Sequence, residues 1–170
     1  MRIFALVAVA LCACAATPHS ATHGAESAMS NKQAVHRLYD EHVNPGRLDD
    51  LSAFIAADYI GADGTRGPTA FASTIARLRI AFPDLHYTLE DVIAEGDKVA
   101  IRWTLRATHR GPFRDIPATG KRVVNGGFAI FRFADGKIIE TTVDTDRLGF
   151  MIAIGRIPYD PVFGPPPRSE

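Results

Sequence analysis

The sequence predicts one α+β domain, in which three N-terminal helices pack on a curved four-stranded antiparallel sheet. Apolar residues recur at helical spacing as far as Pro83, and beyond it they alternate with polar residues, as in strands that have one buried face. Asp135-Gly136 then marks a two-residue hairpin between the last two strands. Helices that precede a meander of strands cover one face of the sheet, so we expect a pocket between the helices and its concave face.

The first half of the chain predicts three helices, over residues 31–43, 48–57 and 69–82. Asn31 is a good N-cap residue for the first helix, and Asn44-Pro45-Gly46 ends it. Pro83 ends the third helix, because proline cannot continue the helical hydrogen-bond pattern.

The second half predicts four strands, over residues 86–94, 99–107, 121–133 and 137–146. A hairpin turn joins the first two strands, a longer loop joins the second to the third, and a terminal helical turn follows the fourth. The folded domain therefore covers residues 31–157, and a loose, proline-rich tail occupies residues 158–170.

The composition excludes several classes of function. The chain has 170 residues and a formal net charge of zero, so no basic excess attracts nucleic acid. Its cysteines, Cys12 and Cys14, both precede the domain, which therefore has no disulfide, thiol nucleophile or zinc–thiolate site. His36 and His42 lie on different faces of the first helix, so the sequence predicts no metal site there.

Residues 1–14 resemble a signal peptide for export. Met1-Arg2 is a short positive start, and the apolar segment that follows is too short to span a bilayer. Leu11-Cys12-Ala13-Cys14 resembles the bacterial lipoprotein cleavage box, in which the final cysteine becomes the lipidated N-terminus.

We therefore expect an exported protein of the periplasm or cell envelope, attached to the membrane through a lipid on Cys14. Residues 15–30 are small and polar and would form a flexible tether to the domain. Two alternatives remain open: ordinary signal cleavage further along the chain, and a true start at Met29, which would make the preceding segment an extension.

A series of short motifs runs along the predicted domain: Phe82-Pro83-Asp84-Leu85, Glu95-Gly96-Asp97-Lys98-Val99-Ala100-Ile101-Arg102-Trp103, Thr108-His109-Arg110-Gly111, Ile116-Pro117-Ala118-Thr119-Gly120-Lys121, Phe131-Arg132-Phe133, Asp135-Gly136-Lys137-Ile138 and Asp146-Arg147-Leu148-Gly149. This ordered series resembles the SnoaL-like polyketide cyclase and ester cyclase family. The resemblance covers about residues 31–157.

The resemblance implies the nuclear transport factor 2-like cone fold, a homodimer formed through the sheet, and ring closure by an intramolecular aldol step without a metal or organic cofactor. In this family an aspartate on the last strand is the general acid and base, and the matching residue is Asp146. Family members commonly carry a tryptophan and a neighbouring histidine after the glutamate of that strand, where this chain has Glu140-Thr141-Thr142.

The register of the last hairpin brings polar residues together. A two-residue turn makes Asn125 face Asp146 and Gly127 face Asp144, so both carboxylates point to one side of the sheet, about 7 Å apart. If that side is concave, the carboxylates enter a mostly apolar pocket, where one of them can abstract an acidic proton next to a carbonyl. Asn125 would hold that carboxylate or polarise the carbonyl.

We assign catalysis to Asp146 and His109, with Asp146 as the general acid and base and His109 as a supporting polar group at the mouth of the pocket. Substrate binding is assigned to polar and aromatic residues expected around the same space: Asn125, Asp144, Trp103, Phe131 and Tyr59.

Several assignments have a structural alternative. Asp144 can be a solvated edge residue, and Asp146 can pair with Arg147 or cap the final helix. His109 can be a turn residue bonded to the backbone, and Trp103 can pack in the core or in an interface.

The sequence thus predicts a pocket protein that performs proton-transfer chemistry on a small hydrophobic carbonyl compound. A non-catalytic exported module that holds an apolar ligand in the same pocket is the alternative. The missing histidine and tryptophan favour the binding module, whereas Asp146 favours the enzyme. A third alternative is a dimerising interaction domain with a filled interior.

Overall fold

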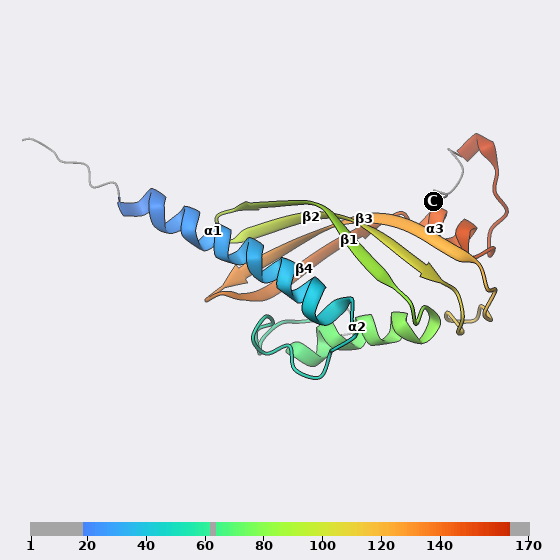
Figure 1. The fold of residues 1–170 in the computed structure, drawn as a ribbon, viewed down its shortest axis with the longest axis horizontal. Coiled ribbons are helices and arrows are strands. Elements are labelled where there is room, and N and C mark those ends of the chain that lie inside the picture. Colours follow the sequence, from blue (N-terminus) through green and yellow to red (C-terminus); the bar gives the residue numbers. More distant parts are fainter. Residues whose placement is uncertain (1–18, 62–63, 164–170) are drawn as a thin grey trace, which may run out of the picture.

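The computed structural model describes residues 19–61 and 64–163 of the protein. The elements follow the chain as α1 (His19–Arg37), a π-helical turn η1 (Leu38–Val43), α2 (Pro68–Ala81), β1 (His86–Glu95), β2 (Lys98–Thr108), β3 (Arg122–Ala134), β4 (Lys137–Thr145), α3 (Arg147–Ala153) and a 3₁₀ turn η2 (Pro161–Phe163). The four strands form one antiparallel sheet in the order β1-β2-β3-β4 (Figure 1). An α+β domain with a four-stranded sheet is therefore confirmed.

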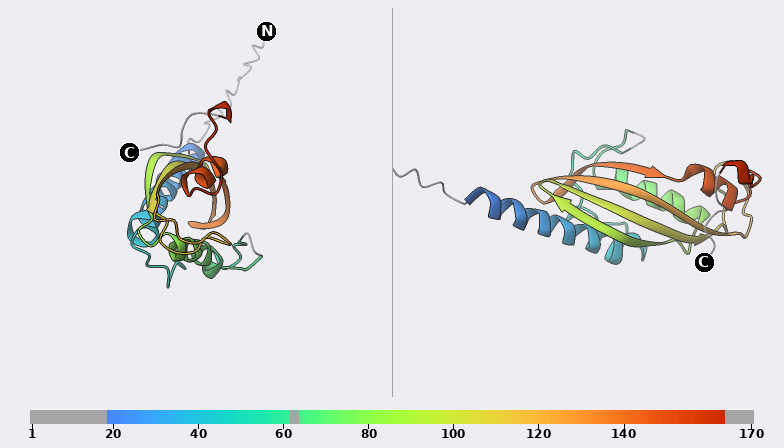
Figure 2. Two further views of the ribbon diagram at one scale, coloured as in Figure 1. Left: turned by 90° about the vertical axis from the view of Figure 1, so that its right-hand side faces the viewer. Right: turned by 90° about the horizontal axis from the view of Figure 1, so that it is seen from above.

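The sheet has an inner face that the helices cover and an outer face that they leave open. In the end-on view of Figure 2 the strands curve around the helical side of the molecule. The inner face consists of odd-numbered residues of β2 and β3, and it packs with apolar side chains of α1, η1 and α2 in one core. Even-numbered residues of the same strands form the outer face.

The turn at Asp135-Gly136 forms as predicted. Both residues have positive φ angles, 49° and 72°, which is the backbone geometry of a type I′ hairpin turn. Ala134 and Lys137 face each other across it, as the sequence requires.

The register beyond this turn differs from the prediction by one residue. Phe133 faces Ile138 and Arg132 faces Glu140, so Ile139 is an extra residue in β4 and forms a β-bulge. Because side chains alternate, the bulge moves every later residue of β4 to the face opposite the one predicted. Phe128, rather than Gly127, consequently faces Asp144.

The predicted helix over residues 48–57 is wrong. Its buried segment makes a parallel bridge between Ile55 and Ile138 at the start of β4. The amide of Ala56 donates to the carbonyl of Ile138 at 3.0 Å, and the amide of Ile138 donates to the carbonyl of Phe54 at 2.8 Å. These backbone groups bond to the sheet edge instead of to a helical turn, so the helices before the sheet are α1 with its π-helical end, and α2.

The flexible tether predicted over residues 15–30 is wrong from His19 onward, because α1 runs without a break from His19 to Arg37. Figure 1 shows its first turns projecting beyond the sheet. The predicted signal segment and Cys14 lie outside the described residues. Within the described part of the chain, no helix has both the length and the apolar composition of a membrane span.

Candidate active site at the end of strand β4

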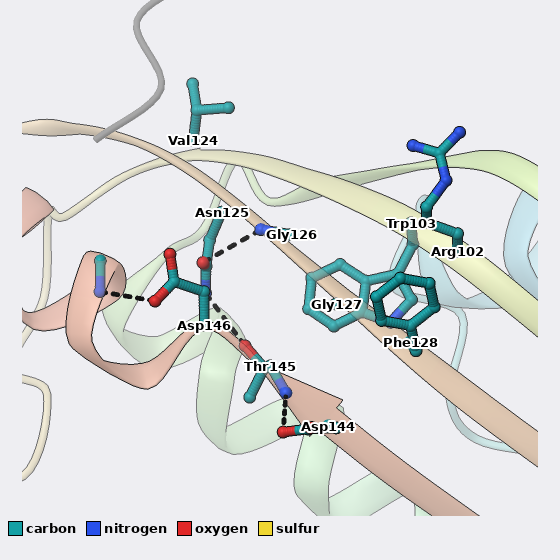
Figure 3. A pocket seen from close by; sticks show the side chains of 11 residues that line it. Arg102, Trp103, Val124, Asn125, Gly126, Gly127, Phe128, Asp144, Thr145 and Asp146 are labelled. Carbon is teal, nitrogen blue, oxygen red and sulfur yellow. Dashed lines mark hydrogen bonds between the residues drawn. The ribbon is translucent and has the colours of Figure 1, made fainter. Parts of the chain in front are cut away.

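A pocket of about 320 Å³ opens where β4 ends and α3 begins (Figure 3). Its volume lies at the lower end of the range for small-molecule sites. Residues from β2, β3 and the β4–α3 junction line it: Arg102, Trp103, Val124, Asn125, Gly126, Gly127, Phe128, Asp144, Thr145, Asp146 and Gly149. The pairing of β3 with β4 stops at Gly127 and Thr145, so the pocket lies at the end of the hairpin ladder.

Gly127 is tightly packed where it lines this pocket. A Cβ atom on Gly127 would collide with the Trp103 ring and with the carbonyl oxygen of Asp144. The absence of a side chain therefore lets the indole of Trp103 pack directly against the backbone of β3. Glycine inside a strand often marks such a close approach of another group to the backbone.

Asp146 lies at the rim of the pocket and caps α3. Its Oδ1 atom accepts a hydrogen bond of 2.8 Å from the amide of Gly149, and its own amide donates to the carbonyl of Gly126 at 3.1 Å. The carboxylate is exposed, and Oδ2 has no hydrogen-bond partner among the described residues. One oxygen thus fixes the carboxylate, while the other can accept a proton from a bound molecule.

Asn125 is buried beside this carboxylate, but it bonds to Thr145. Its Nδ2 donates to Thr145 Oγ1 at 3.1 Å, and its Oδ1 accepts from the amide of Gly126 at 3.0 Å. The prediction that Asn125 faces Asp146 is wrong, because the bulge at Ile139 shifts the register. Asn125 nevertheless lines the same pocket and holds the end of β4 against β3.

Asp144 and Asp146 both line the pocket, as predicted, but they reach it by a different geometry. Asp144 lies opposite Phe128 on the outer face, and its Oδ1 atom accepts from the amide of Thr145 at 2.8 Å. Both carboxylates are exposed, so the apolar enclosure expected around them is absent. Asp144 therefore matches the alternative of a solvated edge residue.

Two pocket residues on the outer face were not predicted as site residues. Phe128 is 59% exposed and gives the pocket an apolar wall. Arg102 gives it a cation, whose Nε atom bonds to Asp91 Oδ2 at 2.6 Å. Arg102, Phe128 and Asp144 form one row across three strands, so a correct register for β4 would have identified them.

His109 does not line the pocket. Its side chain is completely buried, and its ring stacks on Phe82 with the centroids 5.1 Å apart. Nδ1 lies 3.0 Å from Thr119 Oγ1, and Nε2 has no hydrogen-bond partner among the described residues. Burial lowers the pKa of His109 below its ordinary value, and the backbone of Gly111 opposes this in part. The expected position at the pocket mouth is wrong.

The three aromatic residues predicted to bind substrate lie in different places. The Trp103 ring lines the pocket and makes an edge contact with Tyr87, at 5.2 Å between centroids. Phe131 and Tyr59 are buried in the core and do not line this pocket. Among the described residues, no group of three or more histidine, cysteine, aspartate or glutamate side chains is placed to hold a metal ion.

The fold and this site can be compared with known proteins. A family model described as SnoaL-like polyketide cyclase matches residues 33–154. The chain belongs to this family. Asp146, in the pocket at the end of β4, lies within the matched region.

Curated and structural relatives agree with the assignment. The chain is 32% identical over 143 residues to aklanonic acid methyl ester cyclase DauD of Streptomyces sp. strain C5, covering 76% of this chain and 88% of the relative. It superposes on a SnoaL-like polyketide cyclase from Jannaschia sp. CCS1 with a TM-score of 0.67 and 30% identity, covering 76% of this chain and 94% of that one. IdmH from Streptomyces antibioticus gives a TM-score of 0.64 at 28% identity, covering 74% and 98%.

Proposed function

We propose that the protein is a SnoaL-like cyclase that uses Asp146 as its general acid and base on a small hydrophobic carbonyl compound. The observation that carries this proposal is the Asp146 carboxylate at the rim of the pocket, with one oxygen held by Gly149 and the other without a partner among the described residues. Similarity to ester cyclases over three quarters of the chain supports the reaction class.

The proposed reaction needs one proton acceptor that later returns the proton. The Asp146 carboxylate takes a proton from the carbon next to a carbonyl group of the substrate, leaving an enolate. The enolate carbon attacks a second carbonyl of the same molecule, so one carbon–carbon bond forms and the attacked oxygen becomes an alkoxide. That alkoxide receives the proton from Asp146, and the product has the same composition as the substrate.

The other pocket residues fit this chemistry. Phe128 and Trp103 offer apolar surface to the hydrocarbon part of a substrate. Asn125 is buried and bonds to Thr145, so it fixes the strand end from which Asp146 follows. Arg102 adds a cation that can attract the oxygens of an ester or of a developing enolate.

The test uses a matched pair of variants, Asp146→Asn and Asp144→Asn. Asparagine is as good an N-cap as aspartate, so Asp146→Asn keeps α3 and removes only the base. Aklanonic acid methyl ester, the compound in the relative's name, is the first probe, beside smaller esters that carry a second carbonyl group. Chromatography and NMR would detect a ring-closed isomer of unchanged mass.

We expect the wild-type protein to form the ring-closed product, Asp146→Asn to lose at least about a hundredfold in rate, and Asp144→Asn to lose much less. Full activity of Asp146→Asn would overturn the role of Asp146. A reversed order of the two variants would move the base to Asp144.

A non-catalytic ligand-binding module is the second candidate. It is favoured by Thr141 and Thr142, which stand where relatives commonly carry histidine and tryptophan. Saturable binding of the probe at the pocket, with no isomer formed by the wild-type protein, would support the module and contradict the enzyme.

We propose as well that two copies pair through the outer face of the sheet. Ile93 and Ile130 on this face are 68% and 46% exposed, and they lie in one row across the sheet, outside the pocket. Charged pairs flank them, Arg102 with Asp91 on one side and Arg132 with Glu140 on the other. A second copy would cover these apolar residues. Separately, export and lipidation at Cys14 would place the protein at the cell envelope.

A further inference from the structure

We propose that His109 is a positioning residue: its buried ring, acting through Phe82 and Phe150, sets the place of α3 and so of the Asp146 carboxylate. This inference rests on the proposed role of Asp146 in the reaction. It assigns to His109 a contact with other side chains instead of a contact with substrate.

The first contact in this chain of side chains is the stacking of His109 on Phe82. The His109 ring lies nearly parallel to the Phe82 ring, at an angle of 27° and 5.1 Å between centroids. Both side chains are completely buried, so a smaller side chain at 109 would leave a cavity against Phe82.

Phe82 then contacts α3 through an aromatic triangle. Its ring lies 5.5 Å from Phe150 and 5.8 Å from Phe113, and Phe113 lies 5.2 Å from Phe150. Phe150 belongs to α3, and its amide donates to the carbonyl oxygen of Asp146 at 3.0 Å. A displacement of Phe82 is thereby passed to the first turn of α3, where Asp146 lies.

The backbone around His109 is held independently of its ring. The amide of His109 donates to the carbonyl of Lys121, and its carbonyl accepts from the amide of Gly120, each at 2.9 Å. The next two amides, of Arg110 and Gly111, both donate to the carbonyl of Ala81. A change of the side chain at position 109 therefore leaves the loop closed and alters the packing of Phe82.

Simple packing does not explain a histidine at this position. Its Nε2 atom is buried without a partner among the described residues, a cost that a phenylalanine would avoid. What the imidazole adds is the contact of Nδ1 with Thr119 Oγ1, at 3.0 Å, which fixes the ring plane on Phe82. A flat ring packed on Phe82, rather than a charge, is what position 109 supplies, and the bond to Thr119 adds to it by fixing the plane of that ring.

The experiment compares three variants of the whole protein. His109→Ala removes the ring, His109→Phe keeps a flat ring but loses the bond to Thr119, and Thr119→Val removes that bond alone. Hydrogen exchange is followed at the amides of Gly149 and Phe150, which bond to the Oδ1 and carbonyl oxygens of Asp146. Amides of the β1–β2 hairpin serve as the reference for global opening.

We expect His109→Ala to speed exchange at Gly149 and Phe150 by about tenfold or more relative to the reference amides, and His109→Phe to restore most of the protection. Thr119→Val should give a smaller increase at the same two amides. Equal acceleration at all amides, or none at the two reporters, would overturn the proposal.

Kinetics then separate this proposal from the proposed function. If the wild-type protein closes a ring, His109→Ala should lower kcat by about tenfold with little change in KM, and His109→Phe should recover most of kcat. Loss of kcat as deep in His109→Phe as in His109→Ala would overturn the positioning role, because a flat ring on Phe82 would then not be sufficient. Without any turnover the proposed function fails, and the exchange result still decides whether His109 positions α3.

Discussion

Gly149 lies so close to Asp146 that no side chain fits between its Cα atom and the carboxylate. Its amide donates to Asp146 Oδ1 at 2.8 Å, and a Cβ atom at position 149 would overlap the Oδ2 and Cγ atoms of the carboxylate. A hydrogen bond thus fixes Oδ1, and Oδ2 occupies the space that a side chain at position 149 would need. A substitution at Gly149 therefore tests how tightly the base must be held.

Gly149→Ala should displace the carboxylate and break the N-cap of α3. We expect a loss of about 1–2 kcal/mol in the free energy of unfolding, measured with urea, together with a fall in cyclisation rate. The control is Gly24→Ala in the exposed start of α1, where nothing lies within 4 Å of the added methyl group. That variant should be slightly more stable, because alanine favours a helix more than glycine. Unchanged stability and rate in Gly149→Ala would contradict this account.

Gly127→Ala should act on the floor of the pocket. The added methyl group would overlap the Trp103 ring and the carbonyl of Asp144, so the indole must move or the hairpin must open. Overpacking of this kind costs about 1–3 kcal/mol. Intrinsic fluorescence of Trp103, the single tryptophan, should change along with the unfolding midpoint. A spectrum and midpoint like those of the wild-type protein would show that the floor tolerates a side chain.

The last hairpin illustrates which features of the fold could be predicted from the sequence and which could not. Asp135-Gly136 determines the hairpin locally, because both residues adopt positive φ, and this prediction is confirmed. The bulge at Ile139 has no such local signal: its neighbours are apolar and charged like those of a regular strand, and only the pairing of Arg132 with Glu140 reveals it. Arg102 and Phe128, which line the pocket on the outer face, were missed for that reason.

The prediction of a helix over residues 48–57, which include Ile55, was wrong for a related reason. The apolar spacing of this segment fits a helix, but its backbone bonds to Ile138 on a strand more than eighty residues later in the chain. Hydrogen bonds between residues so far apart in the chain do not affect the local spacing of apolar residues, from which the helix was predicted. His109 was wrongly predicted at the pocket mouth. Alternation along a strand indicates only the face on which a residue lies, whereas the stacking of His109 on Phe82 depends on how α2 ends.

Ile130→Asp should test the outer face of the sheet without touching the pocket. Ile130 is 46% exposed and faces Ala100 on β2, and it does not line the pocket. Light scattering after size exclusion should give a dimer for the wild-type protein and a monomer for the variant, because a buried charge without a partner opposes association. Ile80→Asp is the control, since Ile80 is 64% exposed on α2, away from the sheet. A wild-type monomer would contradict the predicted homodimer.

The burial of His109 should make stability depend on pH. Its folded-state pKa is lowered, mainly by loss of solvation, from an ordinary value of about 6.5. Between the two values the unfolded chain binds a proton that the folded chain does not. The free energy of unfolding must therefore fall as the pH drops below about 6.5, by at most about 1.4 kcal/mol per pH unit.

His109→Phe isolates this contribution from the other histidines. The phenylalanine keeps a ring against Phe82 but binds no proton, so the variant should lose less stability than the wild-type protein between pH 7.5 and pH 5. Urea unfolding of both proteins at the two pH values measures that difference. Because the remaining titratable groups are common to both, equal losses would mean that the imidazole at position 109 is as easily protonated in the folded protein as in the unfolded chain. That result would also remove the reason for regarding the ring as an uncharged support for Phe82.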